Sequence, residues 1–338
     1  MAEPAPLPPT ATEVQETNQE QPATEEDEKN KENKKIWFRA VFANDVATCK
    51  HFLESNKVDV DVKHIDNWTA LHIAAWYDFR KLVELLLQNK ADLNNQKGDG
   101  CTPIYLACQL GRVDLVQYFI DEKADIHVRR NCGATPLYIA AQEGKEEVAR
   151  LLLENRADIT AEKHDGADPF YIACQKNHVN LVKLFLEHGA NLNHTQRAGA
   201  TGFYVACKEN SNSVVKFLLE YGGVDVNHFT KIGRTPLHAA CLSSNIEVIQ
   251  LLLDHGGNVN QPNHRGEVSL FSLYIFCFYF IFIYILFITF YFLFLFFIFY
   301  FIFYFLQFNF FLHYFLLGIF FVYFYLQTTK REMFMELY

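Results

Sequence analysis

The segment that decides the fold reads Asp99-Gly100-Cys101-Thr102-Pro103-Ile104-Tyr105-Leu106-Ala107-Cys108-Gln109. It combines a small turn with a short apolar helix, and Gly111 then ends that helix at little cost. Proline is well placed in a first helical turn, because its missing N–H would have no partner there. A second helix is expected over residues 114–121, where apolar side chains recur at helical spacing: Leu115, Val116, Phe119 and Ile120.

This unit recurs with an almost constant period. Successive turn-opening residues are separated by 33, 33, 33, 33 and 34 positions: Thr69, Thr102, Thr135, Asp168, Thr201 and Thr235. The extra residue lies in Tyr221-Gly222-Gly223-Val224-Asp225, which is one residue longer than the matching Asn89-Lys90-Ala91-Asp92. Asp168 replaces threonine in the fourth unit and Gly202 replaces proline in the fifth, so we expect those two turns to be looser.

The units resemble ankyrin repeats. Thr235-Pro236-Leu237-His238-Ala239-Ala240 is close to that family's turn-and-helix motif, and Thr69-Ala70-Leu71-His72-Ile73-Ala74-Ala75 differs mainly at Ala70. The second-helix signature recurs, as in Val248-Ile249-Gln250-Leu251-Leu252-Leu253, and the resemblance covers about 70% of the chain. It implies an all-α solenoid of stacked helix pairs with β-hairpin-like turns. We expect a degenerate repeat at 34–65, then six repeats and the start of a seventh at 66–267.

Residues 1–33 are polar and almost free of aliphatic side chains, so we expect a disordered tail. Its acidic part runs into a lysine cluster, which the sequence leaves open as a nuclear import signal or a solvated tail. The cluster comprises Lys29, Lys31, Lys34 and Lys35.

The net charge of −9 argues against a nucleic-acid partner, because nucleic-acid binders usually carry a basic face. Cys108, Cys174, Cys207 and Cys241 fall at one position of successive units, where Ala75 and Ala141 stand in others. We interpret them as small packing residues in a reducing, cytoplasmic setting, and not as metal ligands or a disulfide scaffold. His72 and His238 alternate with tyrosines at one position, which favours a structural role. We therefore expect no enzyme, no catalytic residue, no cofactor and no metal.

The resemblance implies a protein partner that docks on the inner-helix positions and the hairpin tips. The inner-helix candidates, together with one aromatic tip residue, are Trp68, Trp76, Tyr77, Gln109, Leu110, Gln142, Glu143, Gln175, Lys176, Lys208 and Glu209. Other tip candidates include Ile65, Asp66, Asp99, Cys101, Asn131, Cys132, His164, Asp165, Arg197, Lys231 and Arg234. Trp68, Trp76 and Tyr77 would act as aromatic anchors. The alternative for Trp68 and Trp76 is packing against the degenerate first repeat, and the alternative for the glutamines is a wetted surface.

The segment 268–338 has another character, with no charged residue from Ser269 to Thr329 and most of the chain's 33 phenylalanines. By length it could supply two membrane-spanning helices of about 20 residues each, separated near residues 307–309, which would anchor the protein in a membrane. Its composition is poor in the small residues that let such helices pack. Glu267-Val268-Ser269 can be encoded with a splice-donor sequence, at the point where a seventh unit should continue. We favour a translated intron, in which case a further enzyme or adaptor domain could follow residue 267.

Sequencing the mature transcript across the codons for Glu267 and Val268 tests this interpretation. We expect a spliced message that joins Glu267 to a Thr-Pro-Leu-like continuation. A message that reads straight through to Tyr338 would make the apolar segment genuine and would place the repeats at a membrane.

Overall fold

The computed structural model describes residues 25–268, 285, 287–309, 312–313 and 315–319. The chain divides into two compact units, one ending at Leu273 and one beginning at Tyr274. The helices of residues 25–268 are α1 (Glu25–Phe42), α2 (Val46–Glu54), α3 (Ala70–Tyr77), α4 (Arg80–Gln88), α5 (Pro103–Leu110), α6 (Val113–Asp121), α7 (Pro136–Gln142), α8 (Glu146–Glu154), α9 (Pro169–Gln175), α10 (Val179–Glu187), α11 (Gly202–Lys208), α12 (Asn212–Tyr221), α13 (Pro236–Leu242) and α14 (Ile246–Asp254). A short 3-10 turn, η1 (Ile65–Asn67), precedes α3.

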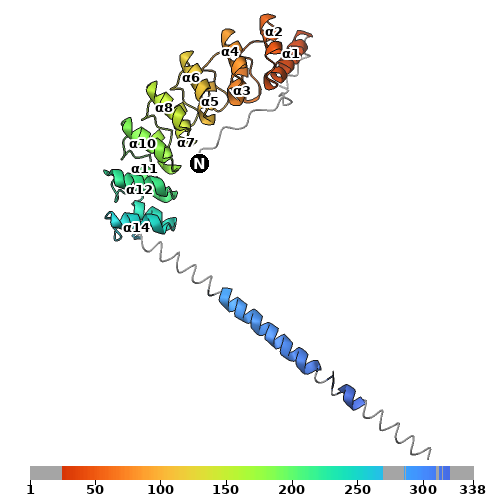
Figure 1. Ribbon diagram of the computed structural model, residues 1–338, viewed down its shortest axis with the longest axis vertical. Helices are drawn as coiled ribbons and strands as arrows, with labels where there is room; N and C mark the ends of the chain where they lie inside the picture. The colour runs from red at the N-terminus through yellow and green to blue at the C-terminus, as the bar shows by residue number, and fades with distance from the viewer. Residues whose placement is uncertain (1–24, 269–284, 286, 310–311, 314, 320–338) are drawn as a thin grey trace, which may run out of the picture. The chain divides into compact units, whose positions relative to one another are not determined.

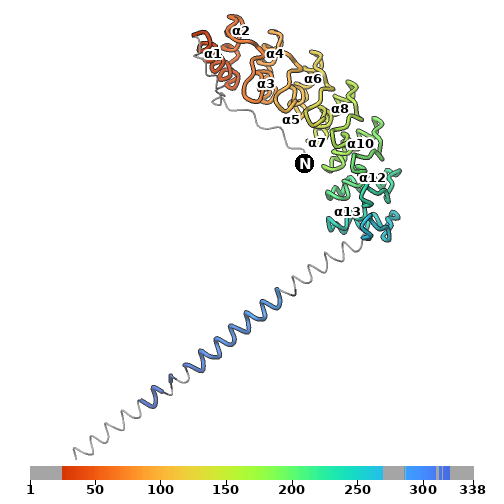
Figure 2. Tube along the Cα trace, turned by 180° about the vertical axis from the view of Figure 1, so that it is seen from behind, coloured from red at the N-terminus to blue at the C-terminus, as the bar shows by residue number. Residues whose placement is uncertain are grey.

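Residues 25–268 form a curved stack of helix pairs in chain order, as Figures 1 and 2 show from opposite sides. The odd-numbered helices from α3 to α13 line the concave side, and the even-numbered helices lie on the convex side. Neighbouring odd-numbered helices contact each other more extensively than neighbouring even-numbered helices do, which produces the curvature. The predicted all-α solenoid is confirmed.

Each odd-numbered helix from α3 onward begins with a side-chain cap. The hydroxyl or carboxylate of the turn-opening residue accepts a hydrogen bond from the backbone N–H three residues later. Asp168 makes this contact with the Tyr171 N–H at 2.7 Å, whereas the Thr69 contact with His72 is 3.5 Å. The expected looser turn at Asp168 is therefore wrong, because a carboxylate caps as well as a hydroxyl does.

Gly202 reflects tight packing and not a loose turn. A Cβ added at this position would lie 2.9 Å from the Phe170 ring and 3.0 Å from the Cys174 Sγ. Thr201 still caps α11, since the Tyr204 N–H donates to its Oγ1 at 3.1 Å. The expectation of a looser fifth turn is thus wrong as well.

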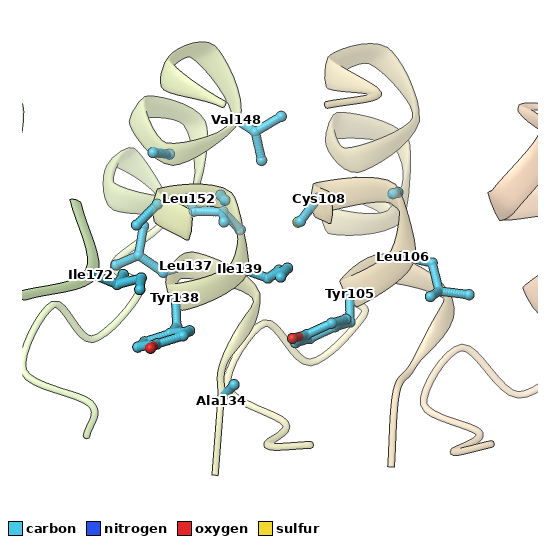
Figure 3. Close-up of a cluster of buried hydrophobic side chains, with 14 of the residues drawn as sticks. Tyr105, Leu106, Cys108, Ala134, Leu137, Tyr138, Ile139, Val148, Leu152 and Ile172 are labelled. Carbon is cyan, nitrogen blue, oxygen red and sulfur yellow. The ribbon is translucent and has the colours of Figure 1, made fainter. Parts of the chain in front are cut away.

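Small side chains let the odd-numbered helices approach. Ala75, Cys108, Ala141, Cys174 and Cys207 are all completely buried. Figure 3 shows Cys108 on α5 pointing toward the next helix pair, which carries Ile139 and Val148. The interpretation of these cysteines as packing residues is confirmed.

The extra residue of the fifth period is absorbed outside the core. Gly222 and Gly223 have φ angles of 83° and 80°, which a residue without a Cβ adopts freely. A Cβ at Gly222 would meet nothing within 4 Å. The insertion therefore leaves the stacking of α11 on α13 intact.

Residues 25–33, which we expected to belong to the disordered tail, form the first turns of α1. Glu25, Glu26, Asp27 and Glu28 occupy the first helical turn, where negative charge is favourable. The far end of α1 is anchored by Trp37, Phe38 and Val41, all buried, and it packs on α2 and α3. Residues 1–24 lie outside the described residues.

One helix of the second unit, Phe287–Asn309, has a mean hydropathy of 2.3 and is long and apolar enough to cross a membrane. This is one such helix in the part of the chain that the structure describes, and the alternative of two membrane-spanning helices gains no support. Most of the residues expected to form the second span, like residues 269–284, lie outside the described residues.

His72 contacts the turn of its own unit through one ring nitrogen and the next unit through the other. Its Nδ1 accepts from the Thr69 N–H at 3.2 Å, and its Nε2 donates to the Cys101 carbonyl at 3.0 Å. His238 repeats this geometry with Thr235 and the Glu267 carbonyl. Burial lowers the pKa of His72 from 6.5 to about 4, so this imidazole is neutral in the folded chain.

We expect His72→Tyr to reduce the loss of unfolding free energy that the wild-type chain shows as the pH falls below neutrality. The unfolded chain protonates His72 near pH 6.5 but the folded chain only near pH 4, so stability is lost as the pH falls through this window. The contribution is about 3 kcal/mol at most. Urea unfolding followed by circular dichroism at pH 7 and 5 measures it, with the exposed His127→Tyr as the control. Equal pH dependence in wild type and His72→Tyr would contradict this account.

Candidate protein-binding surface

The predicted inner-helix residues lie at the C-terminal ends of α3, α5, α7, α9 and α11, which line the concave side of the stack. We call this region the concave surface. It is defined by Trp76, Tyr77, Gln109, Leu110, Gln142, Glu143, Gln175, Lys176, Lys208 and Glu209. The structure thus places residues that are 33 positions apart in sequence on neighbouring helices.

Trp68 does not contribute to this surface. Its side chain is only 1% exposed and packs edge-on against His72 and Trp76, with ring centroids 6.1 and 6.0 Å apart. Trp76 is half-buried. Trp68 therefore packs within its own repeat, and its prediction as a binding anchor gains no support from this burial.

Tyr77 is the exposed aromatic residue of the concave surface, with 44% of its side chain accessible. It stacks on Phe79 at 5.4 Å between ring centroids and meets Phe42 edge-on at 6.5 Å. Phe42 also contacts His64, which fixes the group from the first helix pair. The sequence pattern does not reveal Phe42 and Phe79 as members of this group, because both stand at helix ends outside the repeat motif.

The glutamines do not form an exposed ladder. Gln109 and Gln142 are each 7% exposed, and the Gln142 amide donates to the Glu143 carboxylate at 2.9 Å. Gln175 is half-buried. The Gln109 and Gln142 side chains are largely covered, so they present little polar surface to a partner.

Charged residues supply the rest of the concave surface. Glu143, Lys176, Lys208 and Glu209 are exposed, and Leu110 is half-buried. Lys208 pairs with Glu209 at 2.8 Å, but both side chains remain solvent-facing, so the pair adds little stability. Both signs occur along the stack, with Glu143 followed by Lys176 and then by the Lys208–Glu209 pair, which suits recognition by charge complementarity.

The hairpin turns form a second continuous feature. The turns span residues 64–68, 97–101, 130–134, 163–167, 196–200, 230–234 and 263–267, and each is closed by a backbone hydrogen bond between its first and fifth residues. The N–H of the second residue donates to the carbonyl of the third residue in the preceding turn, as Arg197 does to Asp165 at 2.9 Å. We call the second and third residues of these turns the hairpin-tip ribbon. Cys101, expected among the tip candidates, is buried and lies outside it.

A buried cation supports the N-terminal end of the hairpin-tip ribbon. The Lys97 side chain is 0% exposed and lies 2.6 Å from an Asp99 oxygen, 3.6 Å from Asp66 and 5.2 Å from the Trp68 ring centroid. Arg130 also contacts Asp99 at 3.0 Å. Burial opposes ionisation of Asp99, but its contacts with Lys97 and Cys101 outweigh this and lower the pKa of that carboxyl.

Most of the described cysteines are buried, and Cys132 is half-buried. Cys49, Cys101, Cys108, Cys132, Cys174, Cys207 and Cys241 are free. Burial raises the pKa of Cys241 to about 11 and that of Cys108 further, so these thiols stay protonated at neutral pH. Within the residues that the structure describes, no group of three His, Cys, Asp or Glu side chains could hold a metal ion.

Comparison with known proteins identifies the repeat. A family model of ankyrin repeats (3 copies) matches residues 20–97, 37–130, 79–163, 114–196 and 170–263, which together span most of the chain. The crystal structure of the human ASB11 ankyrin repeat domain is similar, with 30% sequence identity and a TM-score of 0.56. That match covers 61% of this chain and 91% of the other. No curated protein sequence matches. In all, 571 chains of solved structures match, so the likeness identifies the fold and not the partner.

The buried network predicts an unequal effect of two lysine substitutions. Lys97→Ala should lower the free energy of unfolding by about 2 to 3 kcal/mol, because Asp99 loses its buried counter-charge. Lys163→Ala is the matched control. Lys163 pairs with Asp165 at 2.9 Å, but the Asp165 side chain is 55% exposed, so this substitution should lower the free energy of unfolding by only about 0.5 to 1 kcal/mol. Urea unfolding followed by circular dichroism compares them. Equal losses would show that Lys97 contributes no more than a surface pair.

Proposed function

The chain belongs to the ankyrin-repeat family, whose repeats mediate protein–protein interactions, and we propose that it holds its protein partner on the concave surface. The ankyrin fold is typically non-enzymatic, and we propose the same for this protein. Its role is then to present a preformed surface as a scaffold or adaptor.

Tyr77 carries this proposal. An aromatic side chain that is 44% exposed and already fixed by two neighbouring rings can bury a large apolar area at little cost in conformational entropy. Aromatic residues of this kind often dominate the binding energy of protein interfaces.

The exposed charges give the second support. Glu143, Lys176 and the Lys208–Glu209 pair lie at the ends of three successive inner helices, α7, α9 and α11, which pack closely. Their spacing is therefore set before the partner arrives, and a partner with the complementary charge order would bind with little rearrangement.

Tyr77→Ala should raise the dissociation constant of the partner about tenfold, which corresponds to a loss of about 1.4 kcal/mol of binding free energy. Tyr221→Ala is the matched control, because Tyr221 is 57% exposed but lies on α12 at the convex side. Affinity capture with the wild-type chain supplies the partner, and titration with each variant gives the dissociation constants.

Trp76 is excluded from this test because it packs on Trp68, so its truncation would mix folding with binding. Tyr77→Ala should keep the helical circular dichroism of the wild type. Loss of that signal, or equal weakening by Tyr221→Ala, would remove the support for the concave surface.

A further inference from the structure

The hairpin-tip ribbon changes character along the stack. In its earlier turns the basic side chains are compensated by acidic side chains of the same turn. Lys97 pairs with Asp99, and Lys163 pairs with Asp165 at 2.9 Å. The last three turns carry basic residues without such partners. Arg197, Lys231, His264 and Arg265 are exposed, and none forms an ion pair with another of the residues 25–268.

These basic residues lie on neighbouring turns. The Lys231 N–H donates to the Ala198 carbonyl at 2.9 Å, and the His264 N–H donates to the Ile232 carbonyl at 3.2 Å. Residues 197–198, 231–232 and 264–265 are therefore adjacent steps of one ribbon. A single extended segment crossing the turns would meet several positive charges in succession.

Two large apolar side chains lie among these charges. Phe229 is 59% exposed and Ile232 is 57% exposed, and both belong to the sixth turn region. Phe229 stacks on His228, with an interplanar angle of 14° and ring centroids 6.3 Å apart. The His228 Nε2 donates to the Gly199 carbonyl at 3.0 Å, which ties this stack to the fifth turn. The stack on His228 therefore keeps the Phe229 ring exposed to solvent.

We propose that Arg197, Phe229, Lys231, Ile232 and Arg265 form a second binding site, which takes an acidic peptide segment containing an aliphatic or aromatic side chain. Such a segment would pair its carboxylates with the basic groups and cover Phe229 and Ile232. The chain as a whole has a net charge of −9, so this basic patch stands out electrostatically and would steer an acidic partner to one place.

An acidic peptide fits this patch better than a nucleic acid does. A nucleic acid would match the charge, but it would leave the isoleucine without an apolar partner, since bases stack on aromatic rings and phosphates do not cover aliphatic surface. The site is separate from the concave surface, because it lies on the turns and not on the inner helices. It therefore does not depend on the proposed function.

The test uses the full chain in a neutral detergent and a fluorescein-labelled peptide of glutamates around a central phenylalanine. Fluorescence anisotropy gives the dissociation constant. We expect binding that weakens as salt is raised, and we expect no binding of the same peptide with lysines in place of the glutamates. Absence of binding by the acidic peptide, or equal binding by the basic one, would overturn the proposal.

Charge-reversal variants locate the site. Arg197→Glu with Lys231→Glu should weaken the peptide at least about tenfold. Lys63→Glu with Lys81→Glu is the matched control, since both lysines are exposed at the other end of the stack and the change in net charge is the same. Equal weakening by the two pairs would show general attraction by the whole chain and would contradict a site.

Phe229→Ser tests the apolar part and should weaken the peptide roughly fivefold. The side chains at 197, 229 and 231 are exposed, so the helical circular dichroism and melting temperature should match the wild type. An unchanged dissociation constant in Phe229→Ser would remove the apolar component of the proposal.

Two further outcomes would also overturn it. Displacement of the peptide by a single-stranded oligothymidylate at equal concentration would indicate a nucleic-acid surface. Tighter peptide binding after removal of residues 1–24, which contain four glutamates and no lysine or arginine, would indicate that this segment of the chain itself occupies the patch. Tyr77→Ala should leave the peptide affinity unchanged, which separates this site from the concave surface.

Discussion

The structure depends on the close approach of neighbouring inner helices. A single helix pair has too little apolar surface to be stable alone, so each pair is stabilised by the next. The approach requires a small side chain at one position of every unit, and alanine or cysteine fills it throughout. Because the outer helices contact each other less, the stack curves, and the curvature places the ends of the inner helices on one concave side.

The sequence predicted most of this fold from its period. The turn-opening residues, the helix pairs and the buried cysteines all follow from what a helix start and a packed interface require. The two wrong predictions concern turns in which the expected residue is replaced, where the residue type alone suggested a looser turn. Asp168 caps as well as threonine does, and Gly202 makes room for Phe170 and Cys174, which no local pattern reveals.

The surface was less predictable, for a physical reason. Exposure depends on what neighbouring units place against a side chain, and that contact is not encoded at the position itself. Trp68 is covered because Trp76, His72 and Lys97 surround it. Tyr77, the next residue after Trp76, stays accessible. The same holds for Phe229, whose exposure follows from its stack on a histidine held by the preceding turn.

The glycine pair at residues 222 and 223 has a consequence for how such a chain can change over generations. An additional residue there occupies open space and leaves the register of the following helices untouched. Outer loops of this kind tolerate small copying errors, whereas the inner helices tolerate only the gain or loss of whole units. The number of repeats and the length of the outer loops can therefore change independently of each other during evolution.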